Sequence, residues 1–295
     1  MLKNYFIFFL HSYSTLLQKI YIKVYSMKTI YVHIQRSFIF LVFFCTYTPT
    51  YAVENISNNK STILALGMEM SHMRNMLEAY ILIGAKINYK NPTQKLKNGI
   101  AHYETLLGNI QKNYSDEHIQ QSVKKSLRAW EHVKKAMEIA LQNATPIEMK
   151  KGAIFIHGNI RTVIKELAFM KKYFLDKSDI PNKKALNASI EIAASARRLS
   201  AHYMMDLWHL DDPTIQKHWD KGLKIYEDSL NILKHSSFVK NHKFNALLRK
   251  SIKLHHYFTK MGKKAKIYSI LIDKKADMSF KQAKEMTTII LQSKP

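Results

Sequence analysis

Apolar residues recur along most of the chain at alternating steps of three and four positions, which is the spacing of a buried seam on an α-helix. The clearest run comprises Ile63, Leu66, Met70, Met73, Leu77 and Tyr80. Only 8 Gly and 6 Pro occur in 295 residues, which favours long helices over a turn-rich β fold. The pattern predicts an all-α protein with no β-sheet between residues 60 and 292.

Capping signals divide this pattern into eight predicted helices. Pro92 suits a first helical turn, Ser115-Asp116-Glu117 is an N-cap signal, and Thr145 precedes Pro146 as another. The predicted helices span residues 60–87, 92–112, 116–142, 146–175, 184–209, 212–235, 240–272 and 278–292. We expect the last of them to be clearly shorter than the fourth.

A shift of 123 residues without gaps brings similar residues into register. Matching pairs are Arg74 with Arg197, Tyr80 with Tyr203, Gly99 with Gly222, Tyr103 with Tyr226, Glu104 with Glu227 and Leu107 with Leu230. Two divergent copies of one unit explain these matches. We therefore predict two tandem up-down four-helix bundles, at residues 60–176 and 184–293, joined by a linker at 177–183.

The short linker predicts how the two bundles meet. An up-down bundle returns the chain to the end where it began, so the first helices of the two copies should start level and run parallel. Arg74 and Arg197 would then lie at similar heights. We expect them to form a clamp for one shared anion, which would relieve their repulsion.

Residues 1–52 have the order of a secretory signal. Lys28 and Arg36 precede the apolar residues 38–44, and Thr50-Tyr51-Ala52 follows as a small-residue cleavage site. We predict cleavage between Ala52 and Val53, with Met27 as an alternative start of translation. The apolar run is shorter than the roughly 20 residues of a membrane span. We therefore expect a periplasmic protein with no membrane span in the mature chain; the alternative is a protein anchored by an uncleaved signal.

Composition changes this picture in two respects. The net charge is +24, and residues 1–52 contain five of the basic residues and no acidic one, which leaves +19 for the remainder. In an intracellular protein that excess would suggest nucleic acid, but export favours an anionic envelope surface or a small anion, so we expect no nucleic acid partner. Cys45, the sole cysteine, would leave with the signal, so the mature chain can form no disulfide.

Two segments resemble the first helix of a known family of sensor domains. Residues 192–203 (IAASARRLSAHY) and, more loosely, 73–84 (MRNMLEAYILIG) are similar to the first-helix box of the PilJ/NarX-like family, found in nitrate/nitrite sensor kinases and type IV pilus methyl-accepting transducers. Asp211-Asp212-Pro213 and Tyr226-Glu227 resemble the second helix. Neither box retains the family's glutamine. The resemblance implies that Arg74 and Arg197 hold nitrate where two first helices meet.

The residue chemistry agrees with an anion site at these arginines. A guanidinium offers a planar fork of donors that matches an oxyanion. For Arg74 the alternative is an exposed ion pair with Glu78, four residues later. Arg197 has no acidic residue at a similar spacing.

Other chemistry is not indicated. We find no nucleophile with a base, no glycine-rich phosphate loop, no H-E-x-x-H and no paired set of inward carboxylates and histidines, and we predict no enzyme, no cofactor and no metal site. The histidines are interpreted as surface residues. Met68, Met70, Met73 and Met76 are interpreted as core residues rather than copper ligands.

The leading functional interpretation is a periplasmic ligand-sensing or binding protein for nitrate, nitrite or another small anion. Members of the resembled family usually continue into a membrane helix and a signalling module. Because this sequence contains neither after residue 292, we expect it to act through a separate signalling partner. The alternative is a structural envelope protein whose bundles mediate protein–protein interaction and bind no small ligand.

Overall fold

In the computed structural model, the described parts of the chain are residues 59–142, 144–261 and 269–293. Within these ranges every regular element is a helix and no strand occurs, so the all-α prediction is confirmed. The predicted signal segment 1–52, with the alternative start at Met27 and the cleavage site between Ala52 and Val53, lies outside the described residues. None of the described helices is long and apolar enough to span a membrane.

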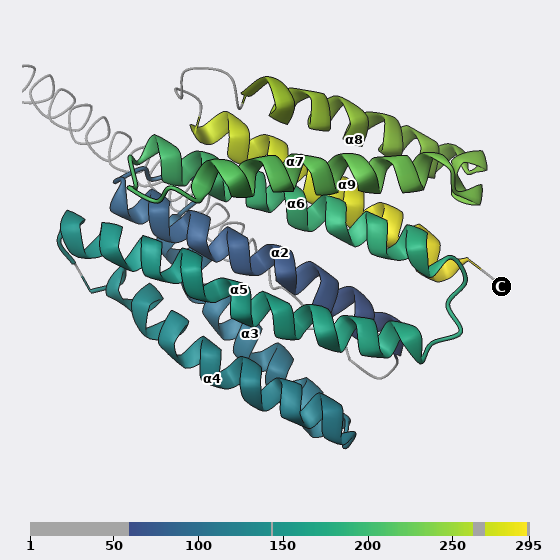
Figure 1. The fold of residues 1–295 in the computed structure, drawn as a ribbon, viewed down its shortest axis with the longest axis horizontal. Coiled ribbons are helices and arrows are strands. Elements are labelled where there is room, and N and C mark those ends of the chain that lie inside the picture. Colours follow the sequence, from purple (N-terminus) through teal and green to yellow (C-terminus); the bar gives the residue numbers. More distant parts are fainter. Residues whose placement is uncertain (1–58, 143, 262–268, 294–295) are drawn as a thin grey trace, which may run out of the picture. The chain divides into compact units, whose positions relative to one another are not determined.

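Eight α-helices and one short 3₁₀ helix make up the described chain (Figure 1). The first four α-helices are α2 (Asn59–Gly84), α3 (Pro92–Asn113), α4 (Glu117–Ile139) and α5 (Pro146–Asp176). The others are α6 (Lys183–Leu207), α7 (Ile215–Lys234), the 3₁₀ helix η1 (Ser237–Lys240), α8 (His242–Met261) and α9 (Ser269–Gln292).

Local capping explains why several helices begin where they do. Pro92 occupies the first turn of α3, where a missing N–H costs nothing. The Asp116 carboxylate accepts from the first backbone N–H groups of α4. Thr145 and Glu148 form a reciprocal capping box at the start of α5. These three predicted helix starts are confirmed to within one residue.

The prediction for the last two helices is wrong. A helix over 240–272 was expected, but α8 ends at Met261 and α9 begins at Ser269 rather than at residue 278. Accordingly α9 has 24 residues and is much nearer in length to α5, which has 31. The lysine-rich sequence after residue 261 has high helix propensity, so the sequence pattern marks neither the end of α8 at Met261 nor the start of α9 at Ser269.

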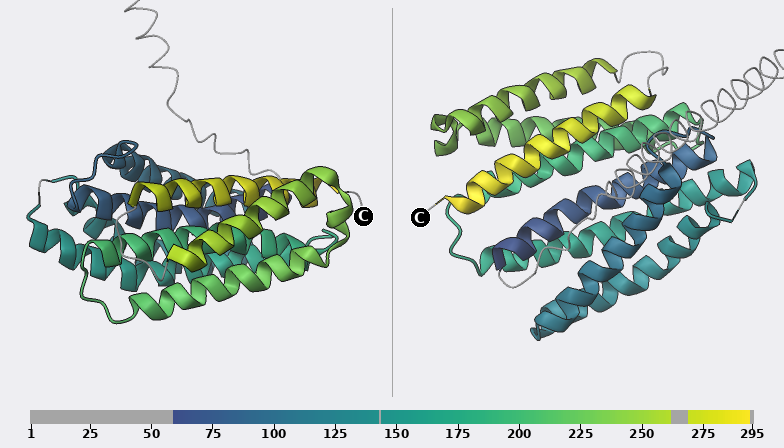
Figure 2. Two further views of the ribbon diagram at one scale, coloured as in Figure 1. Left: turned by 90° about the horizontal axis from the view of Figure 1, so that it is seen from above. Right: turned by 180° about the vertical axis from the view of Figure 1, so that it is seen from behind.

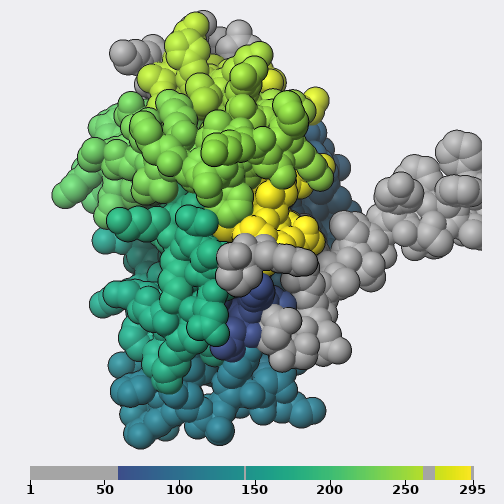
Figure 3. All heavy atoms as spheres, turned by 90° about the vertical axis from the view of Figure 1, so that its right-hand side faces the viewer, coloured from purple at the N-terminus to yellow at the C-terminus, as the bar shows by residue number. Residues whose placement is uncertain are grey.

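The helices pack in sequence order within each half of the unit formed by residues 53–295. In the first half α2, α3, α4 and α5 contact one another in turn, and α5 returns to α2. The helices α6, α7, α8 and α9 repeat that pattern, and α9 returns to α6. The halves join mainly through α2 and α6, so that α3 and α4 lie at one end of this unit and α7 and α8 at the other (Figure 3).

The helices α2 and α6 are parallel. A Cβ on Gly67 would meet the Ile190 side chain at 2.8 Å, and about three turns further along both helices Ser200 Oγ donates to Glu78 Oε1 at 2.9 Å. Contacting residues therefore advance together along both helices, which confirms the parallel arrangement predicted from the short linker. The remaining helices flank this pair on two faces: α5 and α7 cover one face, and α3 and α9 cover the other (Figures 1 and 2).

Candidate anion-binding pocket

A cavity of about 100 Å³ lies where α5 and α7 cover the α2–α6 pair. A cavity needs only about 10–15 Å³ of this kind of volume to hold one water molecule, so this one has room for a small ligand. It is lined by Arg74 and Leu77 of α2, His157, Ile160, Arg161 and Ile164 of α5, Arg198, Ala201 and His202 of α6, and His218 and Lys221 of α7. Four of these side chains are permanent cations and none is a carboxylate.

Among the described residues, no carboxylate forms an ion pair with Arg74 or Arg198. Arg74 is buried, and its Nη1 donates only to backbone oxygens, that of Ala194 at 3.1 Å and that of Met70 at 3.5 Å. Arg198 Nη1 is buried and has no hydrogen-bond partner among the described residues. Burial, followed by the nearby Arg198, lowers the pKa of Arg74 well below its ordinary value. The pocket therefore holds positive charge that no carboxylate of the described residues contacts directly, although Glu191 acts on Arg74 and Arg198 from further away.

Three histidines stand beside these arginines and contact one another. His157 Nδ1 lies 2.7 Å from Asp212 Oδ2, and its Nε2 lies 3.0 Å from His202 Nε2. The His202 ring stacks on that of His218 at 5.6 Å, and Arg161 Nη1 donates to His218 Nε2 at 3.2 Å. If His157 donates Nδ1–H to the carboxylate, its Nε2 accepts from His202, which leaves a lone pair on the buried His202 Nδ1.

Burial and positive neighbours keep these imidazoles neutral. Burial lowers the pKa of His157, and it lowers the pKa of His202 well below the ordinary value with a further contribution from Arg74. Burial and nearby cations lower the pKa of His218 to about 4. A bound anion would oppose the electrostatic part of these shifts, so any anion binding at this pocket would be accompanied by proton uptake.

Arg197 is in a different environment from Arg74, on the opposite face of the α2–α6 pair. Its Nη1 donates to Asp273 Oδ1 at 2.9 Å and to Glu78 Oε2 at 3.4 Å, and its Nη2 pairs with Asp277. Arg197 is almost fully buried by these partners. A guanidinium that already contacts three carboxyl groups has no free donor fork for a further anion.

Two lysines complete this second cluster. Lys90 Nζ lies 3.2 Å from Asp273 Oδ2 and also pairs with Asp277, while Lys95 Nζ lies 3.5 Å from Asp273 Oδ1. Burial and the charge of Asp273 raise the pKa of Glu78 to about 8, so the cluster holds its proton on Glu78 near neutrality. The Arg197 cluster is thus close to internal charge balance, in contrast to the Arg74 pocket.

The parallel helices explain why the predicted clamp of Arg74 and Arg197 is not assembled. Two parallel helices in equivalent register are related by a two-fold axis that runs between them, parallel to both. Equivalent side chains that do not point toward this axis therefore lie on opposite faces of the helix pair. Equal height therefore separates the two arginines instead of bringing them together: the neighbours of Arg74 belong to α5, α6 and α7, and those of Arg197 to α2 and α9. The arginine that joins Arg74 is Arg198.

Most of the other pocket residues could not be predicted from the sequence. The histidines were interpreted as surface residues, yet His157 and His202 are each only 5% exposed, so that interpretation is wrong for both. Spacing of four places His157 and Arg161 on one helix face, but only the packing of α5 against α6 and α7 makes them part of one site. The four methionines interpreted as core residues are buried, as predicted: Met68, Met70, Met73 and Met76.

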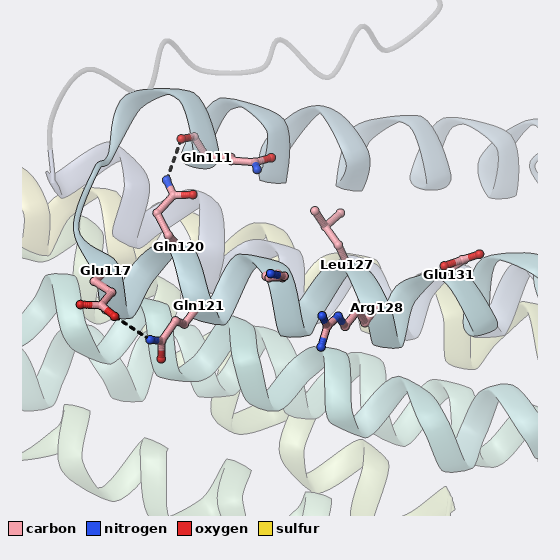
Figure 4. A pocket seen from close by; sticks show the side chains of 8 residues that line it. Gln111, Glu117, Gln120, Gln121, Leu127, Arg128 and Glu131 are labelled. Atoms are coloured by element: carbon pink, nitrogen blue, oxygen red, sulfur yellow. Dashed lines mark hydrogen bonds between the residues drawn. The ribbon is translucent and has the colours of Figure 1, made fainter.

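A larger depression between α3 and α4 does not have the character of a site (Figure 4). It is open to solvent, and charges of both signs line it. Gln120 Nε2 donates to the Gln111 backbone oxygen at 2.8 Å, and Gln121 Nε2 donates to Glu117 Oε1 at 3.0 Å (Figure 4). These polar groups bond to one another, so the depression presents no convergent set of free donors or acceptors.

One polar cluster was missed entirely at the level of sequence. Glu69 and His72 of α2 and His102 of α3 bring atoms that can ligate a metal within 4.8 Å of one another. We predicted no metal site because no complete carboxylate–histidine motif was recognised, but Glu69 and His72 have the Glu-x-x-His spacing.

Comparisons of the chain with protein-family models, with curated proteins and with solved structures gave no match. The resemblance to PilJ/NarX-like sensor domains therefore stays a prediction from sequence, and the functional argument depends on the geometry of the pocket.

Proposed function

We propose that this chain is a periplasmic small-anion-binding protein whose ligand, an oxyanion of the size of nitrate or nitrite, is held beside Arg74 and Arg198. We further propose that the chain is a tandem pair of PilJ/NarX-like four-helix units that passes its signal to a separate partner. The observation that carries the proposal is the contrast between two related arginines: the protein's own carboxyl groups surround Arg197, whereas a cavity lies beside Arg74.

Equivalent contacts in the two halves support the duplication. A Cβ on Gly99 would meet the Met76 side chain at 2.4 Å, and a Cβ on Gly222 would meet Leu199 at 3.1 Å. Both members of the second pair lie 123 residues after those of the first. The same shift relates the close α2–α3 and α6–α7 crossings, so each half uses one glycine to let the same two helices approach.

A second pair of contacts agrees with this relationship. Tyr103 Oη lies 2.7 Å from Ser126 Oγ between α3 and α4, and Tyr226 Oη donates to the Ser251 backbone oxygen at 3.3 Å between α7 and α8. The tyrosines are 123 residues apart and the serines 125, which fits a small insertion between them.

The shift of 123 residues also relates the two arginine environments. It places Arg74 on Arg197, Ala201 on Glu78 and His218 on Lys95. Where Glu78 supplies a carboxyl group to Arg197, the corresponding Ala201 supplies a methyl group that lines the cavity. The cavity beside Arg74 therefore takes the place of a carboxyl group, whose planar pair of oxygens resembles nitrate in size and geometry.

The helices that flank the two arginines, α9 and α5, also differ in whether they supply carboxyl groups. Helix α9 brings Asp273 and Asp277, four residues apart, to Arg197, whereas α5 brings His157 and Arg161, also four apart, to the Arg74 pocket. An anion in the pocket would receive charge-assisted hydrogen bonds worth roughly 1.5–3 kcal/mol each. It would also satisfy Arg198 Nη1 and relieve the repulsion between Arg198 and Arg74.

Calorimetric titration of the full chain with nitrate, nitrite, sulfate and chloride tests the proposal. We expect saturable binding of a small oxyanion, weakened at least tenfold by Arg198→Met and by Arg74→Met. Arg249→Met removes an exposed arginine of α8 and is the matched control, which should bind as the wild type does. Absence of binding heat and of a thermal shift at millimolar anion would favour the structural envelope protein, and equal weakening by the control would reduce the effect to net charge.

A further inference from the structure

A buried carboxylate with two histidines lies apart from the anion pocket, between α2 and α3 and beside α9. Glu69 is fully buried, and its Oε2 lies 3.5 Å from His72 Nδ1 and 2.8 Å from His102 Nδ1. The His72 ring packs 5.4 Å from the Phe280 ring of α9, and it lies 5.3 Å from the His102 ring. Each histidine side chain remains 18% exposed, so the cluster has a route to solvent.

From this geometry we propose that Glu69, His72 and His102 bind a divalent first-row transition metal, with Zn²⁺ as the best-fitting ion. Two imidazoles and one carboxylate are a known Zn²⁺ ligand set, which leaves a fourth position for water. Bonds of about 2.0–2.1 Å at tetrahedral angles separate ligand atoms by about 3.4 Å. The atoms that can ligate already lie within 4.8 Å of one another, so side-chain rotation alone closes the site.

One oxygen of the cluster also points to a missing ligand. Glu69 Oε1 is buried and has no hydrogen-bond partner among the described residues. A buried acceptor of this kind requires an explanation, and a bound ion supplies one.

The other half of the chain shows that packing does not require these polar residues. The shift of 123 residues places Glu69 on Ile192, His72 on Ser195 and His102 on Ile225. Ile192 and Ser195 are buried in the corresponding position of α6. Replacing a buried charged cluster by apolar residues is often neutral or stabilising, so retaining the charges in one half indicates a function for them.

The matched replacement gives a sharp test. Metal-free full-length protein is titrated with Zn²⁺ by calorimetry and with Co²⁺ by visible absorption, which reports tetrahedral coordination. We expect one ion per chain, a rise in melting temperature with Zn²⁺, and at least a tenfold loss of affinity in Glu69→Gln. The triple variant Glu69→Ile, His72→Ser, His102→Ile copies the other half of the chain, so it should fold, lose metal binding and lose the thermal shift.

Two controls keep the outcome decisive. His132→Ala removes an exposed histidine of α4 and should bind Zn²⁺ as the wild type does. The proposal is overturned if the wild type binds no ion, if the folded triple variant still binds one with unchanged affinity, or if His202→Ala rather than Glu69→Gln abolishes binding.

Discussion

Replacing each of the two related arginines by methionine should have very different consequences for stability. Methionine keeps most of the apolar stem of arginine and removes the charge. In Arg197→Met the chain loses a 2.9 Å bond to Asp273, a pair with Asp277 and a 3.4 Å contact with Glu78. In Arg74→Met it loses a 3.1 Å bond to the Ala194 backbone oxygen and a weaker one to Met70.

The size of each change in the free energy of unfolding follows from the groups that lose their partner. Removing one partner of a buried ion pair costs about 3–5 kcal/mol. Lys90 and Lys95 stay within 3.5 Å of Asp273 and compensate part of its charge, so we expect the low end, about 3 kcal/mol, for Arg197→Met. For Arg74→Met the lost hydrogen bond, worth about 1 kcal/mol, is offset by removing a buried charge that Arg198 repels. We expect a change of at most about 1 kcal/mol in either direction.

Urea and thermal unfolding of the full chain at pH 7, without added oxyanion, measures both effects. A loss of 3 kcal/mol corresponds to a fall of about 6–12 °C in melting temperature for a domain of 150–250 residues. Equal destabilisation by the two substitutions would contradict the assignment of one arginine to a filled cluster and the other to an open pocket. A loss below 1 kcal/mol in Arg197→Met would show that the carboxyl groups around it need no arginine.

The other predictions concern pH and packing. Folding lowers the pKa values of His157, His202 and His218, so the unfolded chain binds more protons below about pH 6.5. The free energy of unfolding should therefore decrease as pH falls from 6.5 toward 4. Urea unfolding across that range should show a smaller decrease for His202→Gln than for the wild type, and an equal decrease would contradict this assignment. Gly152→Ala should destabilise the protein by about 1–3 kcal/mol because its Cβ would lie 2.1 Å from Tyr80 Oη. Gly108→Ala, with nothing within 4 Å in the exposed part of α3, should instead stabilise it by about 0.5–1 kcal/mol, and thermal unfolding of the pair compares them directly.

Sequence reasoning worked where a local interaction decides the outcome. The starts of α3, α4 and α5 were predictable because proline and capping side chains act within one helical turn. The start of α9 was not, because lysine and alanine favour a helix at many positions and do not mark where one begins. Propensity alone cannot report where the core of the second half ends.

The candidate site was only half predictable, for a geometric reason. The repeat and the family resemblance singled out Arg74 and Arg197 together as anion-binding residues, and the short linker predicted the parallel helices correctly. Neither observation tells which face of the α2–α6 pair each side chain occupies, because that depends on a rotation about the helix axis. A rotation of one position, about 100°, exchanges Arg197 for Arg198, and the sequence contains both side by side.

The junction of α2 and α6 within a single polypeptide has a consequence for how such a molecule can change. In an assembly of two identical chains, every substitution occurs twice, so a carboxyl group introduced beside one arginine also appears beside the other. Here the residues that face Arg197 and those that face Arg74 belong to different stretches of sequence. The Arg197 cluster can therefore hold the two halves together while substitutions around the Arg74 pocket change its charge, its response to acid and what it can bind. Such a substitution does not alter the residues that contact Arg197.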